Sequence, residues 1–164
     1  MRQKIEKLST ELVSALKEKE LKVSSAESLT GGMISEIITS VPGASEVIEC
    51  GVCSYSNRIK HEILGVKNET LQEYTEYSVE TAKEMAEGVR RLSGADIGIS
   101  TTGIAGPSGA LEGKPVGYVC IGISTAEKTY AKEFFFGSEN SREVIRQLSA
   151  VNALALTIEE AGMQ

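Results

Sequence analysis

Short apolar segments of strand character alternate with helical segments along this sequence, and two strand segments follow one another near its end. Apolar residues spaced three and four apart predict helices, and short apolar runs bounded by turn residues predict strands. The expected helices cover residues 2–20, 33–40, 57–65, 78–94 and 141–161. The expected strands cover 21–26, 45–56, 95–102, 118–125 and 128–136, and the last two form a hairpin. This order predicts an α/β fold with a mixed β-sheet that helices cover on both faces.

The chain has 164 residues, 41% of them hydrophobic and 24% charged, with a formal net charge of −6. No linker, repeat or low-complexity segment interrupts it, so residues 1–164 are expected to form a single domain. An acidic chain without a basic stripe is a poor candidate for binding nucleic acid. A small anionic ligand is still compatible with this charge, because one arginine and a few backbone N–H groups suffice to hold a phosphate.

Neither a membrane span nor a secretory signal is expected in this sequence. No apolar run is long enough to cross a bilayer, and residues 1–20 are charged and helical in pattern. We therefore expect a cytoplasmic protein without a membrane partner.

Three cysteines, Cys50, Cys53 and Cys120, are too few and too scattered for a disulfide framework. The Cys50-x-x-Cys53 spacing falls in an expected strand, where residues three apart point to opposite faces and cannot easily share a metal. We expect small buried hydrophobic residues at these positions, and no metal or cofactor.

The segment KVSSAESLTGGM (22–33) places Ser28 between an expected strand and two glycines that open a helix. A nucleophilic serine needs a nearby base and backbone donors for an oxyanion, and Gly31 and Gly32 would let a substrate approach the backbone closely. The alternative is that Ser28 fills an ordinary turn while Thr30 caps the helix.

Candidate bases are His61, Lys60 and Tyr55. His61 is the only histidine and is expected on the surface. Lys60 would fall in the first turn of the helix at 57–65, where the helix dipole lowers a lysine pKa, unless it is simply a solvated lysine. Tyr55 could relay a proton or could pack at the end of its strand.

A glycine-rich loop after the strand at 95–102 reads STTGIAGPSG and is not a P-loop. It could present Thr102 and Gly103 to a ligand at the end of a strand. Arg142 opens the last helix and could hold a phosphate, or it could be a surface arginine.

Several motifs in order resemble the CinA C-terminal domain family: AESLTGG (26–32), YSNRIK (55–60), TTGIAGPSG (101–109), KPVG (114–117) and the arginine pair Arg142 and Arg146. The resemblance covers nearly the whole chain. It implies a three-layer α/β/α sandwich, usually a homodimer, and nicotinamide mononucleotide deamidase activity. That activity is an amidohydrolase reaction, in which water converts the carboxamide of nicotinamide mononucleotide to a carboxylate and releases ammonia.

By the same resemblance Ser28 is the nucleophile, with Tyr55 and Lys60 as its proton-handling partners. The expected substrate-binding residues are Thr30, Gly31, Gly32, Thr102, Gly103 and Arg142. The chain departs from the family where Leu29 stands in place of a cysteine, and where the segment FFGSENSR lengthens the approach to Arg142. Two alternative functions are a module that binds the nucleotide without turning it over and an amidase for another small carboxamide.

Overall fold

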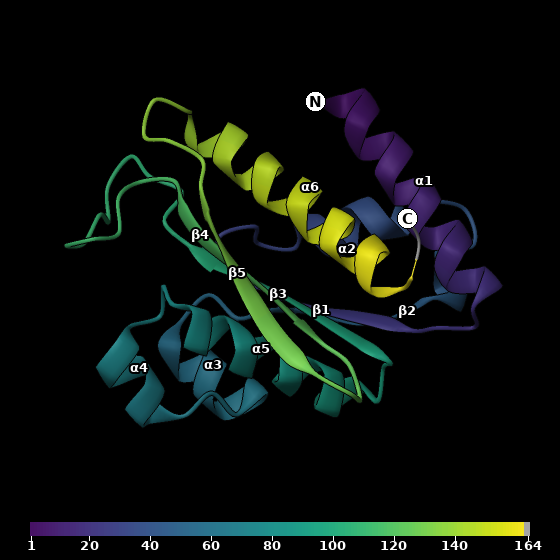
Figure 1. Cartoon of the computed structure of the whole chain (residues 1–164), viewed down its shortest axis with the longest axis horizontal. Helices are drawn as coiled ribbons and strands as arrows, with labels where there is room; N and C mark the ends of the chain where they lie inside the picture. Colours follow the sequence, from purple (N-terminus) through teal and green to yellow (C-terminus); the bar gives the residue numbers. More distant parts are fainter. Residues whose placement is uncertain (163–164) are drawn as a thin grey trace.

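A computed structural model describes residues 1–162, and a mixed β-sheet runs through its centre (Figure 1). The strand order is β2-β1-β3-β4-β5. β1 pairs in parallel with β2 and β3, whereas β3 with β4 and β4 with β5 are antiparallel. The strand bounds are β1 Val23–Glu27, β2 Ile48–Cys53, β3 Ile97–Gly103, β4 Tyr118–Ser124 and β5 Thr129–Phe135. The late hairpin therefore supplies the antiparallel half of the sheet, as predicted.

Helices cover both faces of this sheet, which confirms the three-layer α/β/α prediction (Figure 1). One layer contains α1 Arg2–Glu18, α2 Met33–Thr39 and α6 Arg142–Glu160. The other contains α3 Asn57–Leu64, α4 Asn68–Tyr74 and α5 Val79–Ser93. A short 3₁₀ helix at Ala44–Glu46 precedes β2. Because helices lie on both sides, every residue of β3 and β4 is buried.

Local sequence signals set several of the helix ends. Ser56, Ser78 and Ser141 occupy N-cap positions, and their hydroxyls accept hydrogen bonds from backbone N–H groups in the first turn. Gly65 and Gly94 adopt left-handed conformations that end α3 and α5. The sequence analysis missed α4, because its seven residues are too few to show a clear helical period. It also missed the 3₁₀ helix at Ala44–Glu46, part of which it assigned to a strand.

The prediction that all three cysteines are buried is wrong for Cys53, which is exposed, and Cys50 is only half-buried. Both lie on β2, which is the edge strand of the sheet. Partial desolvation is the main cause that raises the pKa of the Cys53 thiol, and the negative charge of Glu27 is the second. Cys120, on the inner strand β4, is buried as expected.

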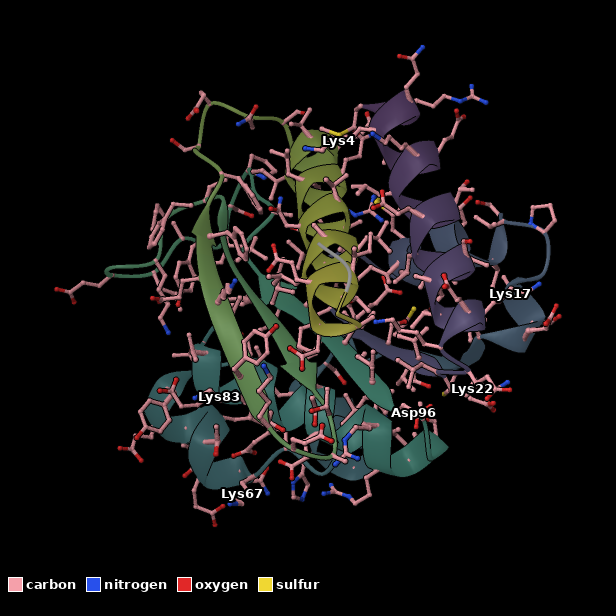
Figure 2. The ribbon with its side chains drawn as sticks, turned by 45° about the vertical axis from the view of Figure 1, so that its right-hand side comes forward. Lys4, Lys17, Lys22, Lys67, Lys83 and Asp96 are labelled. Carbon is pink, nitrogen blue, oxygen red and sulfur yellow. The ribbon has the colours of Figure 1, made fainter. Side chains whose placement is uncertain are left out.

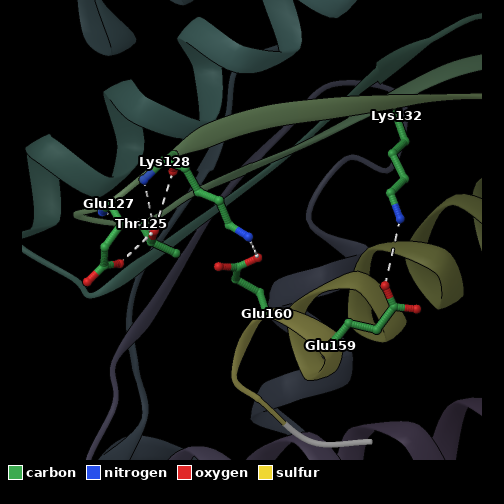
Figure 3. Close-up of polar contacts among 6 residues, drawn as sticks. All are labelled: Thr125, Glu127, Lys128, Lys132, Glu159 and Glu160. Carbon is green, nitrogen blue, oxygen red and sulfur yellow. Dashed lines mark hydrogen bonds and ion pairs between the residues drawn. The ribbon is translucent and has the colours of Figure 1, made fainter.

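Polar contacts hold the ends of the strands to their neighbours. The backbone N–H of Lys22 donates to the Asp96 carboxylate at 2.7 Å, which joins the segments that lead into β1 and β3 (Figure 2). The β5 edge faces the end of α6, where Lys128 pairs with Glu160 at 3.1 Å and Lys132 with Glu159 at 3.7 Å (Figure 3). These partly exposed pairs contribute little energy but match the charges of the two elements.

Candidate active site

A pocket of about 370 Å³ opens beyond the carboxyl ends of the parallel strands β1, β2 and β3. Ligand sites of open α/β sheets usually lie at this edge. The lining comes from the segments that follow these strands, together with residues before α5 and at the start of α6. The lining residues are Ser28, Leu29, Tyr55, Ser56, Asn57, Lys60, Glu76, Tyr77, Gly103, Ile104, Ala105, Gly106, Ser108 and Arg142.

Ser28 and Lys60 meet inside this pocket. Lys60 Nζ lies 3.3 Å from Ser28 Oγ and donates to the Ser54 carbonyl oxygen at 2.9 Å. Lys60 is 1% exposed and Ser28 6% exposed, although both line the pocket. The parallel pairing of β1 with β2 explains this contact, because it brings the residues that follow the two strands to one edge of the sheet.

The buried position of Lys60 changes its protonation. Desolvation lowers its pKa to about 8, and the negative charge of Glu76 opposes this shift. The predicted direction of the pKa shift is confirmed, but its cause is desolvation and not the helix dipole that the sequence suggested. A lysine with this pKa is partly neutral near pH 7 and can accept a proton from the serine hydroxyl.

This pKa has a consequence for stability. Because the folded protein binds the Lys60 proton less tightly than the unfolded chain, protonation of Lys60 destabilises the fold, and this penalty is relieved between pH 8 and pH 10.5. We expect the free energy of unfolding of the wild type, relative to Lys60→Met, to rise by about 2–3 kcal/mol from pH 7 to pH 10. Urea titrations of both proteins at the two pH values measure this difference in the free energy of unfolding. A difference that does not change with pH would contradict the lowered pKa.

The turn that carries Ser28 is held by Glu27, which is 1% exposed. Its carboxylate accepts hydrogen bonds from the backbone N–H groups of Gly32, Ile34 and Ser35, at 2.9–3.0 Å. A carboxylate at this position also matches the positive end of the α2 dipole. The alternative in which Thr30 caps the helix is therefore wrong: Gly32 is the N-cap residue, and Glu27 supplies the acceptor oxygens.

Arg146 of α6 fixes the other side of the same turn. Its guanidinium donates from Nε to the Leu29 carbonyl at 2.9 Å and from a terminal nitrogen to the Thr30 carbonyl at 3.0 Å. Both carbonyls follow Ser28 directly, so Arg146 orients the peptide groups beside this serine. The sequence signal for it was the four-residue spacing from Arg142, which places both arginines on one face of α6.

Two backbone amides are suited to stabilise an oxyanion beside Ser28. The Leu29 N–H follows the serine and has no hydrogen-bond acceptor within residues 1–162. The Gly103 N–H points away from β4 and toward β1, because the next amide, of Ile104, donates to Tyr118 of β4. The amides of Gly31 and Gly32, considered from the sequence, already donate to the Ser28 carbonyl and to Glu27.

The predicted substrate-binding residues occupy two different places. Gly103 and Arg142 line the pocket, whereas Thr30, Gly31, Gly32 and Thr102 lie outside the set that lines it. Thr30 and Thr102 are fully buried. The Thr30 hydroxyl lies 2.7 Å from that of Thr101, and the Thr102 hydroxyl donates to the Glu76 carbonyl at 2.6 Å. The side chains of Thr30 and Thr102 therefore stabilise the segments that form the pocket and do not line it.

Tyr55 lies at the rim of the pocket and is 62% exposed. Its hydroxyl accepts a hydrogen bond from Arg142 at 2.9 Å, and Arg142 also donates to the Gly106 carbonyl at 2.8 Å. No hydrogen bond joins Tyr55 to Ser28 or Lys60 in this structure, so its part in proton handling stays a prediction. The contacts instead hold the Arg142 guanidinium at the pocket mouth.

Glu27, Glu76, Tyr77 and Arg146 are the site residues that sequence reasoning missed. His61 is exposed, as predicted, and its Nδ1 lies 2.7 Å from the Val66 carbonyl oxygen. Among residues 1–162, no three His, Cys, Asp or Glu side chains gather where they could hold a metal ion. In the same range no helix is both long and apolar enough to cross a membrane.

Comparison with known proteins places this arrangement in a family. The family model described as the CinA C-terminal domain matches residues 5–161. A putative competence-damage inducible protein of Thermoanaerobacter sp. (strain X514) is 46% identical over 149 residues, which are 91% of this chain and 36% of that protein. A protein of the same description from Caldicellulosiruptor saccharolyticus is 50% identical over 87% of this chain and 34% of its own length. The chain thus spans about a third of these curated relatives.

Solved structures agree with the sequence comparison. The crystal structure of competence/damage inducible protein CihA from Agrobacterium tumefaciens has a TM-score of 0.92 at 35% identity, covering 95% of this chain and 94% of that one. The competence damage-inducible protein A from Klebsiella pneumoniae has a TM-score of 0.91 at 30% identity, covering 98% and 99%. The sequence match over residues 5–161 and this shared architecture show that the chain belongs to the CinA C-terminal domain family.

Proposed function

We propose that the protein is a serine amidohydrolase that removes ammonia from the carboxamide of nicotinamide mononucleotide. The contact between Ser28 Oγ and Lys60 Nζ, in a pocket with Arg142 at its mouth, is the observation that carries the proposal. The substrate class comes from the family resemblance, and the pocket is compatible with it. Nicotinamide mononucleotide offers a carboxamide to Ser28 and a phosphate to Arg142.

The first half of the reaction forms an acyl-enzyme. Neutral Lys60 accepts the Ser28 hydroxyl proton at Nζ while Oγ attacks the carboxamide carbon. The negative oxygen that develops accepts hydrogen bonds from the amides of Leu29 and Gly103. The Lys60 ammonium then donates its proton to the amide nitrogen, the C–N bond breaks, and ammonia leaves. The hydrogen bond to the Ser54 carbonyl keeps Nζ aimed during both transfers.

The second half hydrolyses the ester on Ser28. Lys60, again neutral, takes a proton from a water molecule whose oxygen attacks the ester carbon. Collapse of this intermediate breaks the bond to Oγ, and Lys60 returns the proton to the serine. The products are nicotinate mononucleotide and the free enzyme.

Incubation of the purified protein with nicotinamide mononucleotide tests the proposal directly. We expect ammonia and nicotinate mononucleotide to appear in equal amounts. Thermal stabilisation by the mononucleotide without release of ammonia would instead indicate a binding module. Release of ammonia only from other small carboxamides would indicate a different amidase.

Arg142 gives a prediction about the phosphate. Among the described residues its guanidinium has only neutral partners, Tyr55 and Gly106, so its charge is available to an anion. We expect Arg142→Ala to lower kcat/KM for the mononucleotide by about 10–100-fold, mainly through KM, because a charge-assisted contact of about 1.5–3 kcal/mol is lost. Kinetics with nicotinamide riboside, which has no phosphate, should change less than about twofold.

The matched control is Arg58→Ala, which removes an exposed arginine of α3 that pairs with Glu62 outside the pocket. Arg58→Ala should leave kcat/KM for both the mononucleotide and the riboside unchanged. Equal losses of kcat/KM for riboside and mononucleotide in the Arg142 variant would exclude a phosphate contact.

A further inference from the structure

The pocket contains a carboxylate that the proposed chemistry does not use. Glu76 lines the pocket together with Ser28 and Lys60, and it is half-buried. None of the ion pairs within residues 1–162 includes Glu76. Its negative charge acts on its neighbours, because it opposes the lowering of the Lys60 pKa and, after burial, contributes to raising the pKa of Tyr77.

The backbone around Glu76 is fixed in this position. The Thr102 hydroxyl donates to the Glu76 carbonyl at 2.6 Å. The preceding residue, Thr75, has φ 68° and ψ 170°, a conformation that residues with a side chain rarely adopt. The Thr75 hydroxyl accepts hydrogen bonds from the Tyr77 N–H at 3.2 Å and from Lys114 Nζ at 3.0 Å. Contacts from Thr102 of β3 and from Lys114 therefore hold a strained segment whose next residue is the pocket carboxylate.

The charges of the pocket are thus unmatched in two places. Within residues 1–162, Arg142 at the mouth has no carboxylate within 4 Å, and Glu76 has no cation within 4 Å. A partly buried charge without a partner loses solvation, so a ligand that brings the opposite charge gains affinity. A ligand with an anionic end and a cationic centre near its amide would satisfy both residues.

We propose that Glu76 is a specificity residue that selects substrates whose carboxamide is carried by a cationic ring. This inference rests on the proposed function, because nicotinamide mononucleotide combines an N-substituted pyridinium ring with a phosphate. Glu76 faces the ring, and Arg142 holds the phosphate. Free nicotinamide has an uncharged ring and no phosphate, and it loses both contacts.

The test compares the oxidised mononucleotide with its dihydro form, which has the same carboxamide, ribose and phosphate on an uncharged ring. Binding is measured by calorimetry at pH 9 in a Ser28→Ala background, which prevents turnover. We expect Ser28→Ala to bind the cationic form more tightly than the dihydro form by about tenfold, as for one partly buried charge contact. Adding Glu76→Gln should remove that preference and change the affinity for the dihydro form less than about twofold.

Two further variants guard against indirect effects. Glu73→Gln removes an exposed carboxylate three residues away, outside this pocket, and should keep the preference. Glu76→Asp keeps the charge on a shorter side chain and should retain a measurable part of the preference for the cationic form. A merely structural role of Glu76 would not require this result.

Equal affinities for the two forms in the Ser28→Ala protein, no binding of either form, or an equal loss of both on Glu76→Gln would overturn the inference. The proposed function is judged separately, by release of ammonia from the mononucleotide by the wild-type protein. Turnover without a charge preference would retain the function and reject the role of Glu76.

Discussion

Ser28→Ala is expected to lower kcat for deamidation of nicotinamide mononucleotide by at least about 10⁴-fold, because no other group in the pocket takes over the covalent step. The side chain is 6% exposed and contacts Lys60, so its loss removes one oxygen and leaves the pocket wall in place. Calorimetric affinity for the mononucleotide should change less than about threefold. Ammonia release and calorimetry on the two proteins measure both quantities.

Ser108→Ala is the matched control, because Ser108 also lines the pocket but lies in an exposed loop. It should retain kcat within about threefold. Undiminished ammonia release by Ser28→Ala would reject the serine as nucleophile and would leave a directly activated water as the attacking group.

Lys60→Met should lower kcat by about 10²–10⁴-fold above pH 8, the usual contribution of a general acid–base group, and by less at lower pH, where the wild-type lysine is itself largely protonated. Methionine matches the length of the buried stem without a titratable nitrogen. In the wild type, kcat/KM should rise about tenfold per pH unit at low pH and level off above the pKa of about 8. At pH 7 about a tenth of the protein then has a neutral Lys60.

Steady-state ammonia release between pH 6 and pH 10 measures this profile. Lys83→Met, which alters an exposed lysine of α5, should reproduce the wild-type curve (Figure 2). A wild-type profile that is flat across this range, or a Lys60→Met protein with the same rising limb, would show that another group handles the proton.

The fold was largely predictable because its signals are local. Helical spacing, the serine caps at Ser56, Ser78 and Ser141, and the late hairpin each depend on a few neighbouring residues. The failure to predict α4 and the burial state of Cys53 have a different origin. A seven-residue helix shows little period, and edge position in a sheet depends on strand order, which no local pattern records.

The association of Ser28 with Lys60 was predictable, but the electrostatics of the pair were not. Ser28 and Lys60 stood out only together with the family resemblance, since a local pattern does not distinguish a buried lysine from a solvated one. The structure shows why this lysine is unusual: strand pairing places it under the serine turn, where desolvation dominates its pKa.

The support around Ser28 depends on tertiary contacts. Arg146 reaches the Leu29 and Thr30 carbonyls across more than a hundred residues of sequence, and no spacing rule connects them. Glu27 had a weak local signal, a carboxylate directly before a turn that opens a helix. Thr30 and Thr102 have hydroxyl groups of the kind that bind ligands, yet these hydroxyls form hydrogen bonds within the protein.

In the proposed reaction Ser28 attacks the carboxamide and forms an ester that water then cleaves. Deamidation in increasing concentrations of hydroxylamine reveals such an ester, because hydroxylamine competes with water for it. We expect nicotinohydroxamate mononucleotide to appear beside nicotinate mononucleotide, with a share that grows with hydroxylamine concentration, and neither product to form with Ser28→Ala. Steady release of ammonia with nicotinate mononucleotide as the sole product at every hydroxylamine concentration would exclude the ester.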